Sequence, residues 1–156
     1  HWSTLIFLAG LFILIGGLDK AGVIDIIADG VTIASKGNLL MAIFIVLVVS
    51  GTFSIVVGNI PATITLIPAI GTFIEQSGVG AGYTVNPLWW ALSLAVCFGS
   101  NGTLISGPAN LMVANISERM GHPISFKDFT EISLPITIFS LLLSFFLLWL
   151  FFIVIL

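Results

Sequence analysis

The sequence predicts an all-α integral membrane fold that contains a re-entrant hairpin and a transmembrane helix broken in its middle. Three observations carry this prediction. The chain is 58% hydrophobic and 7% charged, with a mean hydropathy of +1.24, whereas a soluble domain has roughly 25% charged residues. The charges are confined to 19–36, Glu75 and 118–131. The apolar sequence between them is interrupted by two uncharged runs of Gly, Asn, Ser, Thr and Pro, at 58–63 and 97–110.

The composition also excludes several classes of function. Seven acidic and four basic residues give a net charge of −3, which is too small to indicate nucleic acid or another polyanion as a partner. Cys97 is the only cysteine, so neither an internal disulfide nor a cysteine metal cluster is expected. Because the first span begins at once after His1, we expect a fragment, one half of a larger permease built from two structural repeats.

The first two elements are expected to be a span and a helix at the membrane surface. Residues 2–18 are apolar, and 17 residues cover about 25 Å, enough for a short transmembrane helix. Residues 20–36 then combine an apolar stripe with a charged face that carries Asp25 and Asp29. That pattern is typical of a helix lying in the membrane interface, and no chemistry is assigned to the two aspartates.

Residues 38–76 are predicted to form the re-entrant hairpin. Pro61 disfavours helix at Ile60 but suits the first turn of a new helix, so one helix should end near Val57 and the next begin near Pro61. The turn has no charged residue, which favours a tip buried within the membrane. Two ordinary spans joined at an interfacial turn are the alternative.

The remaining chain is predicted to hold a broken span and a final span. A glycine-rich loop leads to Pro87, and the broken span covers 87–120 with its interruption at 97–110. A polar connection at 118–131 carries two of the basic residues, so the positive-inside tendency makes that side cytoplasmic. Residues 132–156 are expected to be the last span.

Side chains at the two breaks indicate an ion or ligand site. Amide and hydroxyl oxygens, together with unwound carbonyls, form a hard-oxygen shell that suits Na⁺. Helix starts near Pro61 and Pro108 present N–H groups and a partial positive charge, which suit an anion. The alternative is that the asparagines only join helices by hydrogen bonds. Thr63 and Ser106 are weaker candidates, because hydroxyls within spans usually bond back to their own helix.

Several motifs also resemble a known group of membrane proteins. They are WSTLIF at 2–7, NIPATITLIP at 59–68, PLWWAL at 87–92, GSNGTLI at 99–105 and AN at 109–110. Over essentially the whole chain, the sequence resembles the ion transporter superfamily, in particular the group of arsenite permeases, NhaD-type sodium–proton antiporters and the melanosomal P protein. Sodium–dicarboxylate symporters are more distant.

This resemblance implies that the chain is the C-terminal repeat of an inverted-repeat transporter, with its site at the hairpin tip and the helix break. The substrate- or ion-binding residues that follow from it are Asn59, Ile60, Pro61, Thr63, Asn101, Gly102, Thr103 and Asn110, and Ser100 in the same break is a further candidate. The candidate Na⁺ positions are Gly58, Asn59, Asn101 and Gly102. No cofactor is expected, and either Na⁺ or H⁺ would be the coupling ion.

The sequence differs from this group at two places, and the differences favour an anion substrate over sodium–proton exchange. Gly58 stands where the antiporter branch has an Asp, and Gly107-Pro108 stand where the relatives tend to have Ala-Ser. Without an acid at either break, we expect a secondary transporter for an inorganic or small organic anion. A sodium–proton antiporter is the first alternative, and a non-transporting scaffold subunit is another. An intramembrane hydrolase is not expected, because His1 and His122 lie at the terminus or in a loop and no span holds an acid in its interior.

The same reading predicts the surroundings of the protein. We expect an integral protein of the bacterial or archaeal inner membrane. Its partners would be the lipid bilayer, the missing N-terminal repeat of the same protein and a small ion or anion. A homodimer is left open, and nucleic acid is not expected as a partner.

Overall fold

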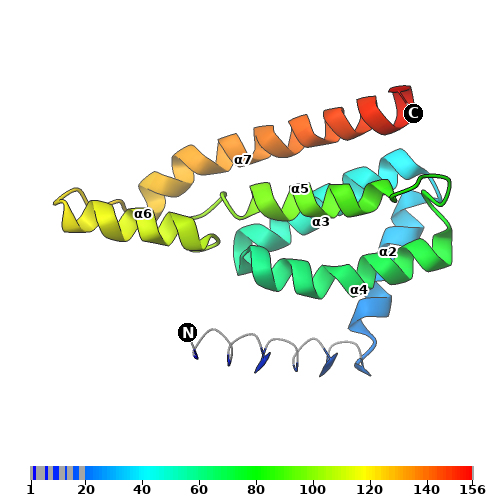
Figure 1. The fold of residues 1–156 in the computed structure, drawn as a ribbon, viewed down its shortest axis with the longest axis horizontal. Helices are drawn as coiled ribbons and strands as arrows, with labels where there is room; N and C mark the ends of the chain where they lie inside the picture. Colours follow the sequence, from blue (N-terminus) through cyan, green and yellow to red (C-terminus); the bar gives the residue numbers. More distant parts are fainter. Residues whose placement is uncertain are drawn as a thin grey trace.

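The computed structural model describes residues 20–155 together with 2, 6, 9, 10, 13, 16 and 17, and this part of the chain is helical without strands. Its α-helices are α2 (Val23–Ser35), α3 (Leu39–Val57), α4 (Asn59–Ser77), α5 (Pro87–Gly99), α6 (Pro108–Arg119) and α7 (Phe126–Trp149), and α7 continues as a π-helix over Leu150–Ile155 (Figure 1). The all-α fold class is confirmed. Most of the predicted span at 2–18 lies outside the described residues.

Two of the described helices are long and apolar enough to cross a membrane by length and composition. They are Leu39–Val57 and Phe126–Ile155, while Pro87–Gly99 is apolar but shorter. At 1.5 Å per residue, α3 is about 28 Å long and the continuous helix from Phe126 about 45 Å long.

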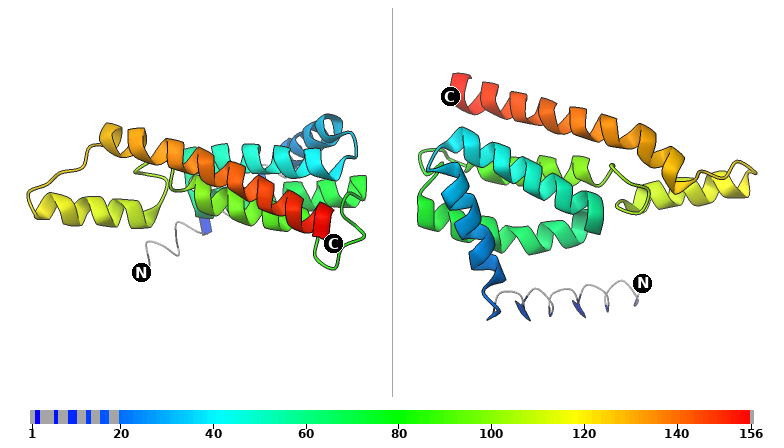
Figure 2. Two further views of the ribbon diagram at one scale, coloured as in Figure 1. Left: turned by 90° about the horizontal axis from the view of Figure 1, so that it is seen from above. Right: turned by 180° about the vertical axis from the view of Figure 1, so that it is seen from behind.

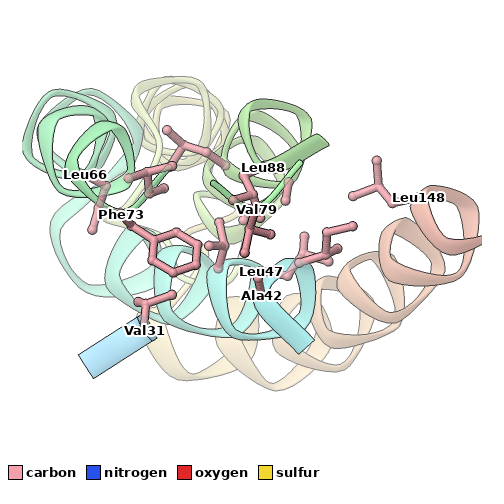
Figure 3. Packing of buried hydrophobic residues seen from close by; sticks show 14 of the residues in the cluster. Val31, Ala42, Leu47, Leu66, Phe73, Val79, Leu88 and Leu148 are labelled. Atoms are coloured by element: carbon pink, nitrogen blue, oxygen red, sulfur yellow. The ribbon is translucent and has the colours of Figure 1, made fainter. Parts of the chain in front are cut away.

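Most of the core is made by α2, α3, α4 and α5. Helices α3 and α4 form an antiparallel hairpin, α5 packs beside α3, and α2 runs across the open end of the hairpin (Figures 1 and 2). Phe73 of α4 is fully buried, and its ring lies beside Val31 of α2 (Figure 3). Because apolar residues from four helices meet there, the core fixes where the hairpin turn lies relative to α5.

The end of the molecule beyond this core is more open. Helices α5 and α6 follow one another along the long axis with residues 100–107 between them, and α7 returns along most of the length (Figures 1 and 2). None of the residues of α6 is buried, and α7 contributes Leu148 to the core. The hairpin turn lies beside the interruption between α5 and α6 (Figure 1).

Helix α7 begins at Phe126, within the segment that the sequence assigned to a polar connection. The cause is the N-cap residue Ser125, whose hydroxyl accepts from the N–H of Asp128 at 3.1 Å. Lys127 and Glu131 are therefore helical and form an exposed ion pair at 3.6 Å. A pair of this kind contributes well under about 1 kcal/mol, so the cap and the apolar sequence that follows account for the earlier start.

Candidate functional site

The turn between α3 and α4 is a single residue, Gly58. Its φ of 90° and ψ of 168° lie in a region that is essentially restricted to glycine. The Gly58 N–H donates to Ser54 O at 2.9 Å, and its carbonyl accepts from the N–H of Ala62 at 3.2 Å. Helix α4 starts at Asn59, so Pro61 lies in its first turn, where a missing N–H costs little.

Residues 100–107 form a loop whose carbonyls are bound by nearby side chains. The Ser106 hydroxyl donates to Ser100 O at 2.7 Å and lies 2.9 Å from Thr103 O. The side-chain amide of Asn110 donates to the same two carbonyls at 3.1 Å each. Because unpaired backbone groups in hydrocarbon are costly, these two side chains replace the helical hydrogen bonds that the break removes.

The hairpin turn and the break touch at several points. The Thr103 hydroxyl donates to Ile55 O at 3.1 Å. A Cβ built on Gly102 would lie 2.9 Å from Cγ1 of Ile55, and one built on Gly58 would lie 2.9 Å from Ser106 O. Gly58 therefore allows the backbones of the two breaks to come into direct contact, and Gly102 makes room for the Ile55 side chain.

Small residues on α3 and α5 hold this contact in place. A Cβ on Gly99 would lie 2.5 Å from Gly51 O, so the two helices approach as closely as their backbones permit. The buried hydroxyl of Ser54 donates to Val96 O at 2.8 Å across the same interface. From the other side, the hydroxyl of Ser133 on α7 donates to Gly102 O at 3.1 Å.

A groove of about 430 Å³ runs between α4 and α5 next to the turn. Asn59, Ile60 and Thr63 line it from α4, and Ser93 and Cys97 line it from α5. The other lining residues are Ile64, Ile67, Trp89, Leu92 and Val96. Its wall is mainly apolar, with two hydroxyls, one amide and one thiol as polar groups.

The predicted site residues therefore divide into two neighbouring places. Gly102 and Thr103 lie where the breaks meet and Asn110 braces the loop from α6, whereas Asn59 and Thr63 line the groove.

Some of their polar groups are already used locally. Asn59 Oδ1 accepts from the N–H of Ile60 at 2.8 Å, and the Thr63 hydroxyl donates to Asn59 O at 2.8 Å. The Ser100 hydroxyl donates to Cys97 O at 2.9 Å. Asn101 is exposed, and its side chain forms no hydrogen bond within the described part of the chain. Asn101 is thus the predicted ligand whose amide is free for a solute.

The helix starts at the breaks offer few free N–H groups. At α6, Pro108 has none, and the N–H groups of Asn110 and Leu111 both donate to Gly107 O, at 3.1 and 3.3 Å. At α4, Pro61 has none, and the N–H of Ile60 is taken by its neighbour's side chain. An anion at these helix ends would therefore be held mainly by the helix dipole and by few direct hydrogen bonds.

Neither break holds a charged residue. Among the described residues, no group of three or more His, Cys, Asp or Glu could hold a metal ion. A cation at the breaks would accordingly be bound by carbonyl and amide oxygens, the donor set that hard alkali cations take.

Three residues that matter to this geometry were missed or undervalued by the sequence reasoning. Ser106 was expected to bond back to its own helix, as Thr63 does, but it lies in the loop and bonds two loop carbonyls. Its position directly before Gly107-Pro108, the start of a helix, is the signal that could have found it. Nothing in the sequence around Ser54 and Ser133 indicates their roles, since their hydrogen-bond partners lie far away in the sequence.

Comparison with known proteins places the chain among transporters. The sequence profile of the citrate transporter family matches residues 1–95, which is more than half of the chain. No solved structure matches the chain.

Curated relatives agree with this result. An uncharacterized transporter of Mycobacterium tuberculosis is 39% identical over 150 residues, covering 96% of this chain and 34% of that protein. An uncharacterized transporter of Synechocystis is 32% identical, covering 97% of this chain and 36% of that protein. The human P protein is 34% identical over 145 residues, which cover 90% of this chain and 17% of the P protein. The chain spans about a third of the length of the first of these relatives.

Proposed function

Because this chain belongs to the citrate transporter family, we propose that the full-length protein is a secondary transporter and that this chain supplies half of its binding site. The substrate we propose is a small anion, organic or inorganic, moved together with a coupling ion. Citrate, the anion in the family's description, is one member of this class.

The contact between the two breaks is the observation that carries the proposal. Irregular backbone at membrane depth persists only where protein, water or a bound ligand satisfies it. Here Gly58 meets Ser106 and Thr103 bonds Ile55 O, so two interruptions that are far apart in the sequence form one uncharged polar region. A scaffold subunit would not need two helix breaks side by side, because continuous helices satisfy their own backbone hydrogen bonds in the membrane.

We propose Na⁺ as the coupling ion, held where the breaks meet. Carbonyl oxygens have two lone pairs, so Gly58 O and Gly102 O, which each accept one hydrogen bond, keep capacity for a cation. Asn101 adds an exposed amide oxygen. A bound Na⁺ would in turn attract the anion, which compensates for the lack of a basic side chain in either break.

Sodium–proton exchange is the competing function, and Gly58 argues against it. The antiporter group carries an Asp at this position, but any Cβ here would lie 2.9 Å from Ser106 O at a φ of +90°. This backbone therefore has no room for the carboxylate that would carry the proton. An antiporter built on this chain would need its acid from the other repeat.

The proposed topology follows from the same geometry. The turn of the α3–α4 hairpin lies beside the break between α5 and α6 (Figure 1), so the hairpin would be re-entrant if α5 and α6 together cross the bilayer. The missing N-terminal repeat would then supply the other half of the site. We place the protein in the inner membrane of a prokaryote.

The test is transport by the full-length protein in liposomes. Uptake of labelled citrate, arsenite and sulfate is measured under an imposed Na⁺ or pH gradient. The variants are Asn59→Ala and Asn101→Ala, and the matched control is Asn115→Ala, an exposed asparagine on α6 away from both breaks.

Three results are distinguishable. Na⁺-driven uptake of an anion that is lost in Asn101→Ala and kept in Asn115→Ala supports the proposal. Internal pH changes on addition of Na⁺, without anion uptake, would establish the antiporter instead. Folded protein that moves neither would leave the breaks as architecture and remove the transport claim.

A further inference from the structure

Most hydroxyl groups of α7 bond back to their own helix, and one of the two that do not reaches the break. Hydroxyls within helices usually bond back to the carbonyl four residues earlier. In α7 three side chains do this, at 2.7 to 2.8 Å: Thr130 to Phe126 O, Ser140 to Ile136 O and Ser144 to Ser140 O. Ser133 does not, and its hydroxyl reaches Gly102 O, which is 31 residues away in the sequence.

The carbonyl that Ser133 binds, Gly102 O, accepts its hydrogen bond from a helix that is not adjacent to the loop in the sequence. Ser100 O and Thr103 O are bound by Ser106 and Asn110, from the loop itself and from the helix that directly follows it. Gly102 O accepts from α7. Because Gly102 is a glycine, its peptide groups rotate more easily than those of other residues. The hydrogen bond from Ser133 therefore restricts a carbonyl whose residue has no side chain to limit its rotation.

We propose that Ser133 is a positioning residue that sets the affinity of the break for Na⁺ by fixing the direction of the Gly102 carbonyl. This inference rests on the proposed function, in which that oxygen is a Na⁺ ligand. One lone pair accepts from Ser133 and the other faces the cation. Ligands held in the bound geometry before binding cost less entropy when the ion arrives. Releasing the carbonyl should weaken Na⁺ binding without removing any ligand atom.

The chain offers a matched control on the same helix face. Thr137 lies one turn after Ser133 and is 2% exposed, yet its hydroxyl has no hydrogen-bond partner in the described structure. Thr137→Val removes a buried hydroxyl of α7 and keeps the side-chain shape. Ser133→Ala also removes a hydroxyl from this face, but that hydroxyl holds Gly102 O. The two variants therefore separate the hydrogen bond from general changes in α7.

The experiment uses the full-length protein with NaCl replaced stepwise by choline chloride at constant ionic strength. The first readout is the Na⁺ concentration that half-saturates thermal stabilisation in detergent. The second is the Na⁺ concentration for half-maximal anion uptake in liposomes. For Ser133→Ala we expect both to rise about threefold to tenfold, the factor that a lost hydrogen bond corresponds to, with the maximal uptake rate little changed. Ser133→Thr should restore the wild-type value, and Thr137→Val should match it.

Each other outcome has a distinct meaning. If wild type shows no Na⁺ response in either assay, Na⁺ coupling in the proposed function is wrong. If wild type responds but Ser133→Ala lowers only the maximal rate, Ser133 is structural and the positioning role is overturned. An equal shift in Thr137→Val would overturn it as well. Should Ser133→Ala fail to fold, Ser133→Cys, which keeps a weak donor, must give an intermediate shift for the inference to stand.

Discussion

Gly58 and Ser106 bring the hairpin turn and the helix break into direct backbone contact, since a Cβ on Gly58 would lie 2.9 Å from the Ser106 carbonyl oxygen. The same glycine has a φ of +90°, so both its conformation and its surroundings require a residue without a side chain. The two breaks are therefore one unit, and any change at Gly58 is felt at residues 100–107.

The first prediction follows from this contact. Gly58→Ala should lower the free energy of unfolding by about 1–3 kcal/mol, the usual cost of a residue held in a disfavoured backbone region. It should also lower anion uptake, because the turn must move away from Ser106. The measurements are thermal unfolding in detergent and uptake in liposomes. Gly82→Ala is the control, since a Cβ there meets nothing within 4 Å. Equal behaviour of the two variants would show that the contact is dispensable.

The second prediction concerns the packing of α3 against α5. Gly99→Ala should destabilise the protein by at least about 1–3 kcal/mol, the range for an overpacked core. The Cβ would lie 2.5 Å from Gly51 O, and a backbone atom cannot rotate away as a side chain can. Gly71→Ala on α4 is the comparison, because its Cβ would meet only Trp89, at 3.9 Å. Thermal unfolding should separate the two clearly, and a stable Gly99→Ala protein would contradict the packing described here.

The sequence predicted where the helices break but not how the breaks meet. Val57 ends α3 as the Gly58 to Pro61 run indicates, because turn and helix-start signals are local. Contact between Gly58 and Ser106 depends on the approach of α3 to α5 at Gly51 and Gly99. Nothing in the sequence indicates that Gly51 and Gly99 face each other, because they lie on different helices.

Among the site residues too, hydrogen bonds to near neighbours in the sequence were predictable and those to distant residues were not. Asn110 was predicted as a ligand at the helix break, and the structure adds that its side-chain NH2 group donates to two loop carbonyls. Thr63 was expected to bond back to its helix, and its hydroxyl does so at Asn59 O. Ser133 could not be found from the sequence, since nothing near it marks it from the other hydroxyls of α7.

The third prediction tests the bracing of the loop by Asn110. Asn110→Asp replaces the two donated hydrogen bonds by a carboxylate facing the carbonyls of Ser100 and Thr103. Loss of donors at partly buried groups costs about 1–3 kcal/mol, and repulsion between oxygens adds to it, so uptake and thermal stability should both fall. Asn115→Asp places the same charge on an exposed position of α6 and should change neither. Wild-type uptake in Asn110→Asp would exclude the bracing role.

The fourth prediction concerns the opposite end of the molecule, where Tyr83 ties the loop before α5 to the end of the last helix. Its hydroxyl donates to Phe152 O at 2.6 Å, and the two rings pack edge to face at 5.4 Å. A π-helix is rare compared with an α-helix, so this hydrogen bond to Phe152 O should help to stabilise the stretch Leu150–Ile155. Tyr83→Phe keeps the ring contact and removes only the hydroxyl.

Tyr83→Phe should therefore cost about 0.5–1.5 kcal/mol of stability, the net value of one hydrogen bond, and leave anion uptake unchanged. Hydrogen–deuterium exchange should become faster in the stretch Leu150–Ile155 and stay the same at the breaks, because no contact joins Tyr83 to residues 100–107 in the described structure. Thr84→Val is the control, since Thr84 is exposed beside Tyr83. A loss of uptake in Tyr83→Phe would mean that a change at the C-terminal end of the last helix alters the breaks. The helix would then couple its two ends, and the contacts around the breaks would not alone determine uptake.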